Sequence, residues 1–186
     1  GGQSWERRNR ASNAEAAEAG HEGHDHDPSE VGSCVHNMVR APGSKDLMYQ
    51  QNHHGVFRSR DGGRSWDDIT AGLPSTFGFP IAVHPKDPAR IWTIPLNGDS
   101  QGRFPPGASA AVWHSTDGGD SWTRQGNGLP QENCFFTVLR QAMATDAEGG
   151  VYFGTNTGSV FASLDGGASW QELARHLPTI TSVETL

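Results

Sequence analysis

The chain has 186 residues and a formal net charge of −7, and 19% of its residues are charged. Because it carries no basic stripe, we expect no nucleic-acid partner. No apolar run approaches the roughly 18 residues that a transmembrane helix requires, so no membrane span is expected. No signal peptide is visible, and the compartment stays open, with a cytoplasmic location favoured over secretion.

The chain opens on the tail of a motif that recurs later in complete form. The tail is Gly1-Gly2-Gln3-Ser4-Trp5, and the complete motif, Ser-x-Asp-Gly-Gly-x-Ser-Trp, occupies residues 59–66, 115–122 and 163–170. The Trp residues that end the four copies recur 61, 56 and 48 residues apart. Such a repeat predicts a repeat architecture. The partial copy predicts that residues 1–8 form the outer strand of a truncated unit.

Residues 9–33 read as a polar, His-rich loop insertion. His21, His24 and His26, with the neighbouring carboxylates Asp25 and Asp27, are candidate ligands for a divalent metal such as zinc, nickel or copper. His36 and His53 could approach from the adjacent strand and loop. The alternative is a solvated insertion that binds metal only weakly, since the spacing matches no defined metal motif.

Three units of four short strands are predicted after this loop, over residues 34–74, 75–130 and 131–178. In each unit two apolar strands come first, at 35–39 and 46–50, at 79–83 and 90–94, and at 135–139 and 151–154. A third and an outer strand flank each repeat motif. Four strands per unit, repeated every 40 to 50 residues or so, are typical of propeller blades. Residues 179–186 fit a strand that closes a ring.

The repeat motif itself is predicted to be a β-hairpin turn with a structural role. Gly supplies the positive φ that the turn needs, while the Asp carboxylate and Ser hydroxyl bond turn amides. The Trp ring then packs over the hairpin base. The residues given this role are Ser59, Asp61, Gly63, Trp66, Ser115, Asp117, Gly119, Trp122, Ser163, Asp165, Gly167 and Trp170.

These motifs resemble the BNR or Asp-box repeat of sialidase-like and sortilin-like β-propellers. The segments Tyr49–His53 and Phe77–Pro80 strengthen the resemblance, and the whole chain looks like the C-terminal half of a bacterial BNR-repeat protein, a group often labelled glycosyl hydrolase. The resemblance implies an all-β propeller of four-stranded antiparallel blades. The ring is expected to be incomplete, with about three full blades plus flanking strands, and the remaining blades are expected from a missing N-terminal half.

Strand direction sorts the loops between two faces. If inner strands run down, the Asp-box hairpins lie at the bottom, with His84, and the loops after second and outer strands lie at the top, where such propellers usually bind ligands. The predicted ligand-binding residues are Gln51, Asn52, His53, His54, Arg103 and Asn156. We expect Asn52, His53 and Arg103 to converge near the ring axis. Top-face aromatics such as Phe77 and Phe79 could stack on sugars or plug the channel.

No catalytic residue can be assigned from the sequence. A sialidase uses three arginines, a Tyr/Glu nucleophile pair and an acid, but Tyr49 and Tyr152 lie within strands without an evident Glu. Arg40 and Arg140 are expected to follow inner strands and point to the lower end. Cys34 and Cys134 begin the inner strands of non-adjacent blades, so they are expected to be buried free thiols.

Three functions remain open. The first is a propeller whose top face binds a small molecule, such as a glycan, or a protein. The second is an exo-α-sialidase-like glycoside hydrolase, with catalytic residues partly outside this chain. The third is an assembly-factor scaffold, like the propellers with similar repeats that aid photosystem assembly. Fold alone does not choose between them.

Overall fold

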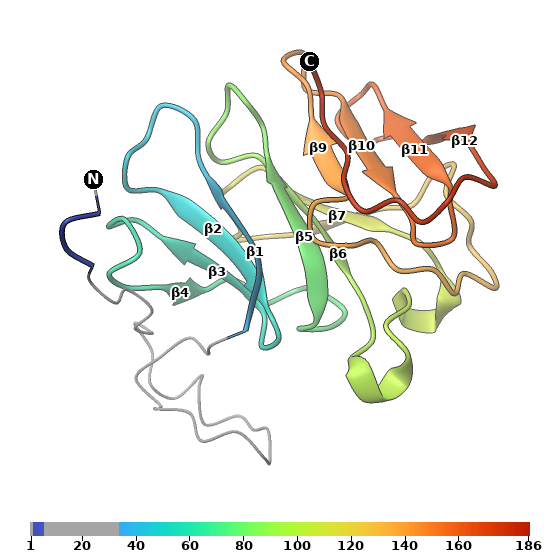
Figure 1. Cartoon of the computed structure of the whole chain (residues 1–186), viewed down its shortest axis with the longest axis horizontal. Coiled ribbons are helices and arrows are strands. Elements are labelled where there is room, and N and C mark those ends of the chain that lie inside the picture. The colour runs from blue at the N-terminus through green and yellow to red at the C-terminus, as the bar shows by residue number, and fades with distance from the viewer. Residues whose placement is uncertain (1, 6–33) are drawn as a thin grey trace.

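A computed structural model describes residues 2–5 and 34–186, which fold into three antiparallel four-stranded sheets (Figure 1). The first sheet holds β1 (Val35–Arg40), β2 (Met48–Asn52), β3 (Val56–Ser59) and β4 (Asp67–Asp68). The second holds β5 (Gly78–Val83), β6 (Ile91–Pro95), β7 (Val112–Ser115) and β8 (Thr123–Gln125). The third holds β9 (Met143–Thr145), β10 (Val151–Gly154), β11 (Val160–Ser163) and β12 (Gln171–Ala174). The prediction of all-β propeller blades is confirmed.

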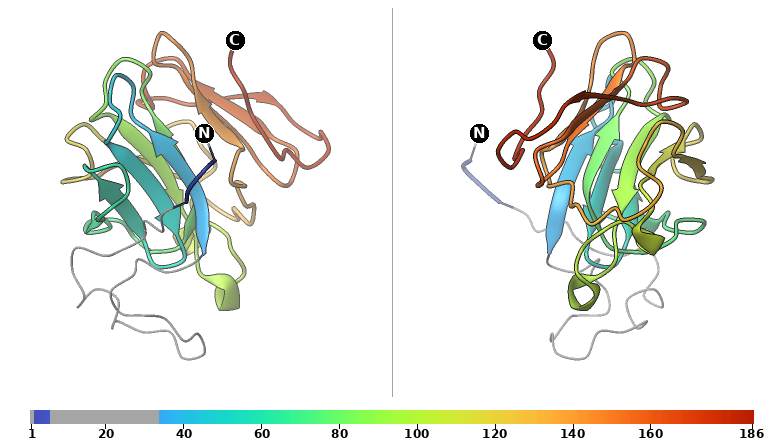
Figure 2. Two further views of the ribbon diagram at one scale, coloured as in Figure 1. Left: turned by 60° about the vertical axis from the view of Figure 1, so that its left-hand side comes forward. Right: turned by 90° about the vertical axis from the view of Figure 1, so that its right-hand side faces the viewer.

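The three blades stand side by side, with their inner strands β1, β5 and β9 as neighbours (Figures 1 and 2). Within residues 2–5 and 34–186 they form an open arc, and no further sheet completes a ring. Two short 3₁₀ turns, Asp99–Gln101 and Pro106–Ala108, interrupt the long connection between β6 and β7. Across the described residues no helix is both long and apolar enough for a bilayer crossing.

The core lies between the blades. Because the middle blade has a neighbour on each side, every residue of β6 is buried and its sequence, Ile-Trp-Thr-Ile-Pro, is almost continuously apolar. Trp92 is fully buried, and its indole N–H donates to the carbonyl of Gly166 in the next blade at 3.0 Å. Arg58 makes the equivalent link between the first two blades, donating to the carbonyl of Gly118 at 2.8 Å and to Asp120 at 2.9 Å.

Each Asp-box hairpin is held by its own side chains. In the first, the Ser59 hydroxyl donates to Asp61 at 2.9 Å and accepts from the Gly63 amide at 2.7 Å. The Ser65 amide and hydroxyl both donate to the Asp61 carboxylate, at 2.9 and 2.7 Å. The second and third boxes repeat the pattern. These donors lower the pKa of each box carboxylate to about 2.

The inner strand of the third blade is not the predicted run 135–139 but β9 (Met143–Thr145), which pairs with β10 through a tight turn after Asp146. The side chains of residues 135–139 do alternate between buried and exposed, since Val138 is fully buried and Phe135 is 63% exposed. The run packs into the core without joining the ladder. Arg140 therefore precedes the inner strand and lies at its upper end, which corrects the lower-end prediction.

Neither end of the described chain forms a strand of the three blades. Residues 2–5 form no strand, and Trp5 is 92% exposed. The candidate ligands His21, His24 and His26 lie outside the described residues, as does the rest of the loop 9–33. At the other end, the Val183 amide donates to the Gln141 carbonyl at 2.9 Å, and Ser182 forms a single parallel bridge with Gln141 beside β9. A ring-closing role for residues 179–186 stays a prediction.

Candidate functional site

Two guanidinium groups gather over a pair of buried phenylalanines, Phe77 and Phe79, at the beginning of β5. The Arg140 Cζ lies 4.9 Å from the ring centroid of Phe79, and the Arg103 Cζ lies 5.7 Å from it. Arg103 is also 6.0 Å from the centroid of Phe77, whose ring lies 5.2 Å from that of His53. We call Phe77, Phe79, Arg103, Arg140 and His53 the aromatic–arginine cluster. Guanidinium groups over aromatic faces are held by cation–π attraction.

The backbone around Arg103 is fixed from the next blade. Arg103 has a left-handed φ of 54°, and its carbonyl accepts the Thr137 hydroxyl at 2.6 Å. The ring of Phe104 meets that of Phe135 at 5.1 Å, edge to face. The β6–β7 connection is thus fastened to the segment that leads to Arg140, so both arginines reach the same surface from different blades.

Gln51 and Asn52 were predicted to contact a ligand, but their side chains form hydrogen bonds within the protein. The fully buried Gln51 amide donates to the carbonyls of Asn52, Gly55 and Thr76, at 2.8, 3.1 and 2.9 Å. The Asn52 Oδ1 accepts the amides of His54 and Gly55, at 2.7 and 3.1 Å. These two residues shape the β2–β3 loop that carries His53. Of the expected trio, His53 and Arg103 meet at Phe77, whereas the Asn52 side chain turns into the loop.

Asn156 and His54 are also placed by backbone contacts. Asn156 pairs with Thr137: its amide donates to the Thr137 carbonyl at 2.8 Å, and its Oδ1 accepts the Thr137 amide at 2.7 Å. It holds the segment before Arg140 against the β10–β11 loop. The half-buried His54 stands next to His53 in the β2–β3 loop, where its backbone amide donates to the Asn52 Oδ1.

A second group of side chains adjoins the cluster. His36 on β1 meets His53 edge to face, with ring centroids 4.6 Å apart, and its Nδ1 lies 2.5 Å from the Gly78 carbonyl. The Cys34 Sγ lies 3.9 Å from His53 Nε2. Both cysteines are free: Cys34 is exposed rather than buried as predicted, because it precedes β1, whereas Cys134 is buried. Burial raises the pKa of the Cys134 thiol to about 11.

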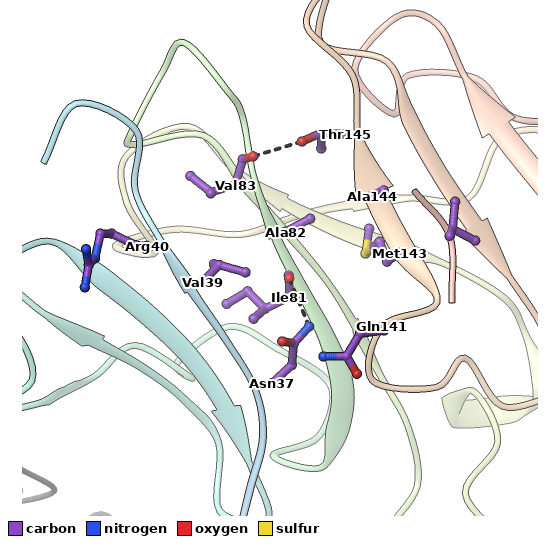
Figure 3. A pocket seen from close by; sticks show the side chains of 11 residues that line it. Asn37, Val39, Arg40, Ile81, Ala82, Val83, Gln141, Met143, Ala144 and Thr145 are labelled. Atoms are coloured by element: carbon purple, nitrogen blue, oxygen red, sulfur yellow. Dashed lines mark hydrogen bonds between the residues drawn. The ribbon is translucent and has the colours of Figure 1, made fainter. Parts of the chain in front are cut away.

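Between the inner strands lies a cavity of about 420 Å³, drawn in Figure 3. Asn37 spans one end of the cavity, donating to the carbonyls of Arg140 at 2.7 Å and Ile81 at 3.5 Å. Thr145 spans the other side, with its hydroxyl donating to the Val83 carbonyl at 2.9 Å. Its walls combine apolar and polar side chains and are formed by Asn37, Val39, Arg40, Ile81, Ala82, Val83, Gln141, Met143, Ala144, Thr145 and Val183. No carboxylate side chain is among these described lining residues.

The sequence predicted Phe79 as a top-face aromatic and His36 as a possible metal ligand, but it did not predict that Phe79 contacts two arginines, and it placed Arg140 at the opposite end of the blade. Phe79 and His36 belong to strand patterns that also suit ordinary core packing, since they are 2% and 4% exposed. Arg140 was misplaced together with the inner strand of its blade. Its only usable signal was a lone arginine directly after an apolar run.

Comparison with known proteins supports the fold. No family model matches the chain. The Photosystem II assembly lipoprotein Ycf48 of Synechococcus sp. (strain CC9902) is 32% identical over 136 residues, which is 68% of this chain and 35% of that protein. The chain thus spans about a third of the length of this curated relative.

Among solved structures, YCF48 bound to D1 peptide matches with a TM-score of 0.52 and 18% identity, over 78% of this chain and 42% of that chain. The GH74 enzyme of Niastella koreensis matches with a TM-score of 0.60 and 17% identity, over 81% and 23%. At these identities the structures establish a shared fold. The chain is built of Asp-box propeller blades, as its repeats predicted.

Proposed function

We propose that this chain is part of an assembly-factor-like propeller that binds an extended, carboxylate-bearing peptide segment of a partner protein. The observation that carries the proposal is the pair of exposed guanidinium groups, Arg103 and Arg140, over the single ring of Phe79 at 5.7 and 4.9 Å. Two fixed cations on a chain of net charge −7 form a local surface complementary to carboxylates.

The neighbouring cavity supports a peptide rather than a free anion as the ligand. Asn37 lines the cavity and its side-chain amide donates to the carbonyl of Arg140, so the cationic surface and the cavity adjoin. A peptide whose carboxylate lies on the arginines could place its next side chains in this cavity, against half-buried lining residues such as Val39 and Val183. Arginine forks bind carboxylates bidentately, which fixes orientation as well as charge.

The comparisons favour this reading over the glycoside hydrolase. The curated relative is named as an assembly lipoprotein, and one similar structure was solved with a peptide bound. The GH74 enzymes share the fold, and fold does not carry their chemistry across. The hydrolase alternative therefore rests on resemblance alone.

The proposal is tested with an array of 12-residue peptides that differ in carboxylate content, followed by fluorescence anisotropy with the best acidic peptide. We expect acidic peptides to bind in preference to their amide or lysine counterparts. The double variant Arg103→Ala/Arg140→Ala should weaken binding at least tenfold, since it removes both cations. Rising salt should weaken wild-type binding.

The matched control is Arg64→Ala/Arg175→Ala, which removes the same charge at two exposed arginines away from the cluster. It should change affinity less than twofold. Equal losses in both double variants would mean that only net charge matters, and an array without preference for carboxylates would overturn the proposal.

A further inference from the structure

We infer that Cys34, His36 and His53 form a binding site for a transition metal ion of the zinc type. Their candidate ligand atoms all lie within 4.8 Å of one another. The three residues come from three places: the residue before β1, β1 itself, and the loop between β2 and β3. The inference goes beyond the proposed function, because metal binding at these residues requires no peptide.

The spacing is close to that of a tetrahedral site. With Zn–S near 2.3 Å and Zn–N near 2.0 Å, ligand atoms around zinc are separated by about 3.4–3.6 Å. The observed distance from Cys34 Sγ to His53 Nε2 is 3.9 Å. Because all three ligand atoms lie within 4.8 Å of one another, no pair needs to close by more than about 1.4 Å. Cys34 is exposed and lies just before β1, so a change of its side-chain rotamer can adjust the distances from its sulfur to the two imidazoles.

His36 is oriented in the way metal-ligating histidines usually are. A carbonyl oxygen only accepts, so the 2.5 Å contact with Gly78 makes Nδ1 the donor and leaves the lone pair of the neutral ring on Nε2. The ring is 4% exposed and packs against Phe77 and Phe79, with centroids 5.2 and 4.7 Å away. This apolar wall fixes the ring and lowers the local dielectric, and both effects favour a preformed metal site.

The ligand types select the metal. One thiolate and two imidazoles favour zinc and copper over magnesium or calcium, which prefer oxygen ligands. Three protein ligands also leave a fourth position for water or another ligand. This site is separate in sequence from His21, His24 and His26, so a test must remove those three histidines as a second source of binding.

The test uses the full chain with His21, His24 and His26 replaced by Gln. Cobalt(II) is titrated and followed by its thiolate-to-cobalt charge-transfer absorption, and zinc(II) is then added in competition. We expect one cobalt per chain, with a charge-transfer band that zinc displaces. Cys34→Ser should abolish the band, and His53→Gln should weaken cobalt and zinc binding at least tenfold.

Two controls keep the result specific. His54→Gln changes the adjacent histidine of the same loop, and Cys134→Ala removes the other thiol; both should leave the band and the affinity unchanged. Circular dichroism checks that each variant is folded. The inference is overturned if the wild-type cysteine chain shows no band, or if Cys34→Ser or His53→Gln binds as well as the parent. A peptide array without a preference for carboxylates would contradict the proposed function but would not change the cobalt and zinc measurements. The two proposals can therefore be tested independently.

Discussion

The imidazole of His114 stacks on the indole of Trp92, with ring centroids 4.8 Å apart and planes inclined by 11°. The two residues are direct cross-strand partners on β7 and β6. Burial here, together with the nearby Arg90 charge, lowers the pKa of His114 from 6.5 to about 4. The folded chain therefore holds this imidazole neutral under conditions where an unfolded chain would protonate it.

This predicts a loss of stability in mild acid. Because the folded pKa is below the unfolded value, the unfolded state binds more protons between about pH 6.5 and pH 4, so the free energy of unfolding falls as pH falls through that window. After allowance for solvent screening, we expect a loss of about 1–2 kcal/mol. His114→Phe keeps a flat ring on Trp92 and should flatten this part of the pH profile, measured by urea unfolding at several pH values. His176→Asn, at an exposed histidine, should leave the profile unchanged; a persistent slope in His114→Phe would assign it to other groups.

The Asp boxes predict a second, more acidic transition. The Ser65 amide does most to lower the pKa of Asp61, and the Ser121 and Ser169 hydroxyls do most for Asp117 and Asp165. A folded pKa of about 2, below the ordinary 3.8, means that the stabilisation is complete above about pH 4 and is lost as pH falls through 2. Asp117→Asn keeps the shape but loses the charge.

We therefore expect Asp117→Asn to have a free energy of unfolding about 1 kcal/mol lower at pH 7, because its hydrogen bonds are weaker. Between pH 4 and pH 2 its free energy of unfolding should fall by less than that of the wild type. Urea unfolding at pH 2.5, 4 and 7 measures both. Glu132→Gln, at an exposed carboxylate, is the control. If both variants show the wild-type acid profile, the box carboxylates do not determine it.

The sequence predicted the Asp-box half of each blade well because every residue of that motif acts locally. Ser, Asp and Gly close the turn through bonds spanning at most four residues, so the flanking strands could be located from the motif alone. The inner strand of the third blade was predicted at the wrong place. The alternating apolar residues Phe136 and Val138 indicate which side chains are buried, but the strand that pairs with β10 is set by the turn after Asp146.

The site was predicted only in part for the same physical reason. His53 and Arg103 stand in polar loops and were recognised by residue type. Their convergence on Phe77 and Phe79 depends on packing between the blades, as does the arrival of Arg140 from the third blade. No local pattern encodes that packing, so the sequence named His36 and Phe79 as candidates without predicting that they lie together.

Blade docking itself supplies the last prediction. Gly128 has a φ of +86°, and a Cβ there would lie 2.0 Å from the backbone carbonyl oxygen of Trp170 in the next blade. The Trp170 amide donates to the Asn127 carbonyl at 2.9 Å, so the two backbones cannot separate without losing that bond. Gly43 has a similar φ of +70°, but a Cβ added there would have nothing within 4 Å.

Gly43→Ala should therefore lower the free energy of unfolding by about 1–2 kcal/mol, which is the cost of left-handed backbone strain alone. Gly128→Ala should cost clearly more, because the third blade must shift. Equal unfolding free energies for the two variants in urea would show that the contact between Gly128 and Trp170 yields without cost.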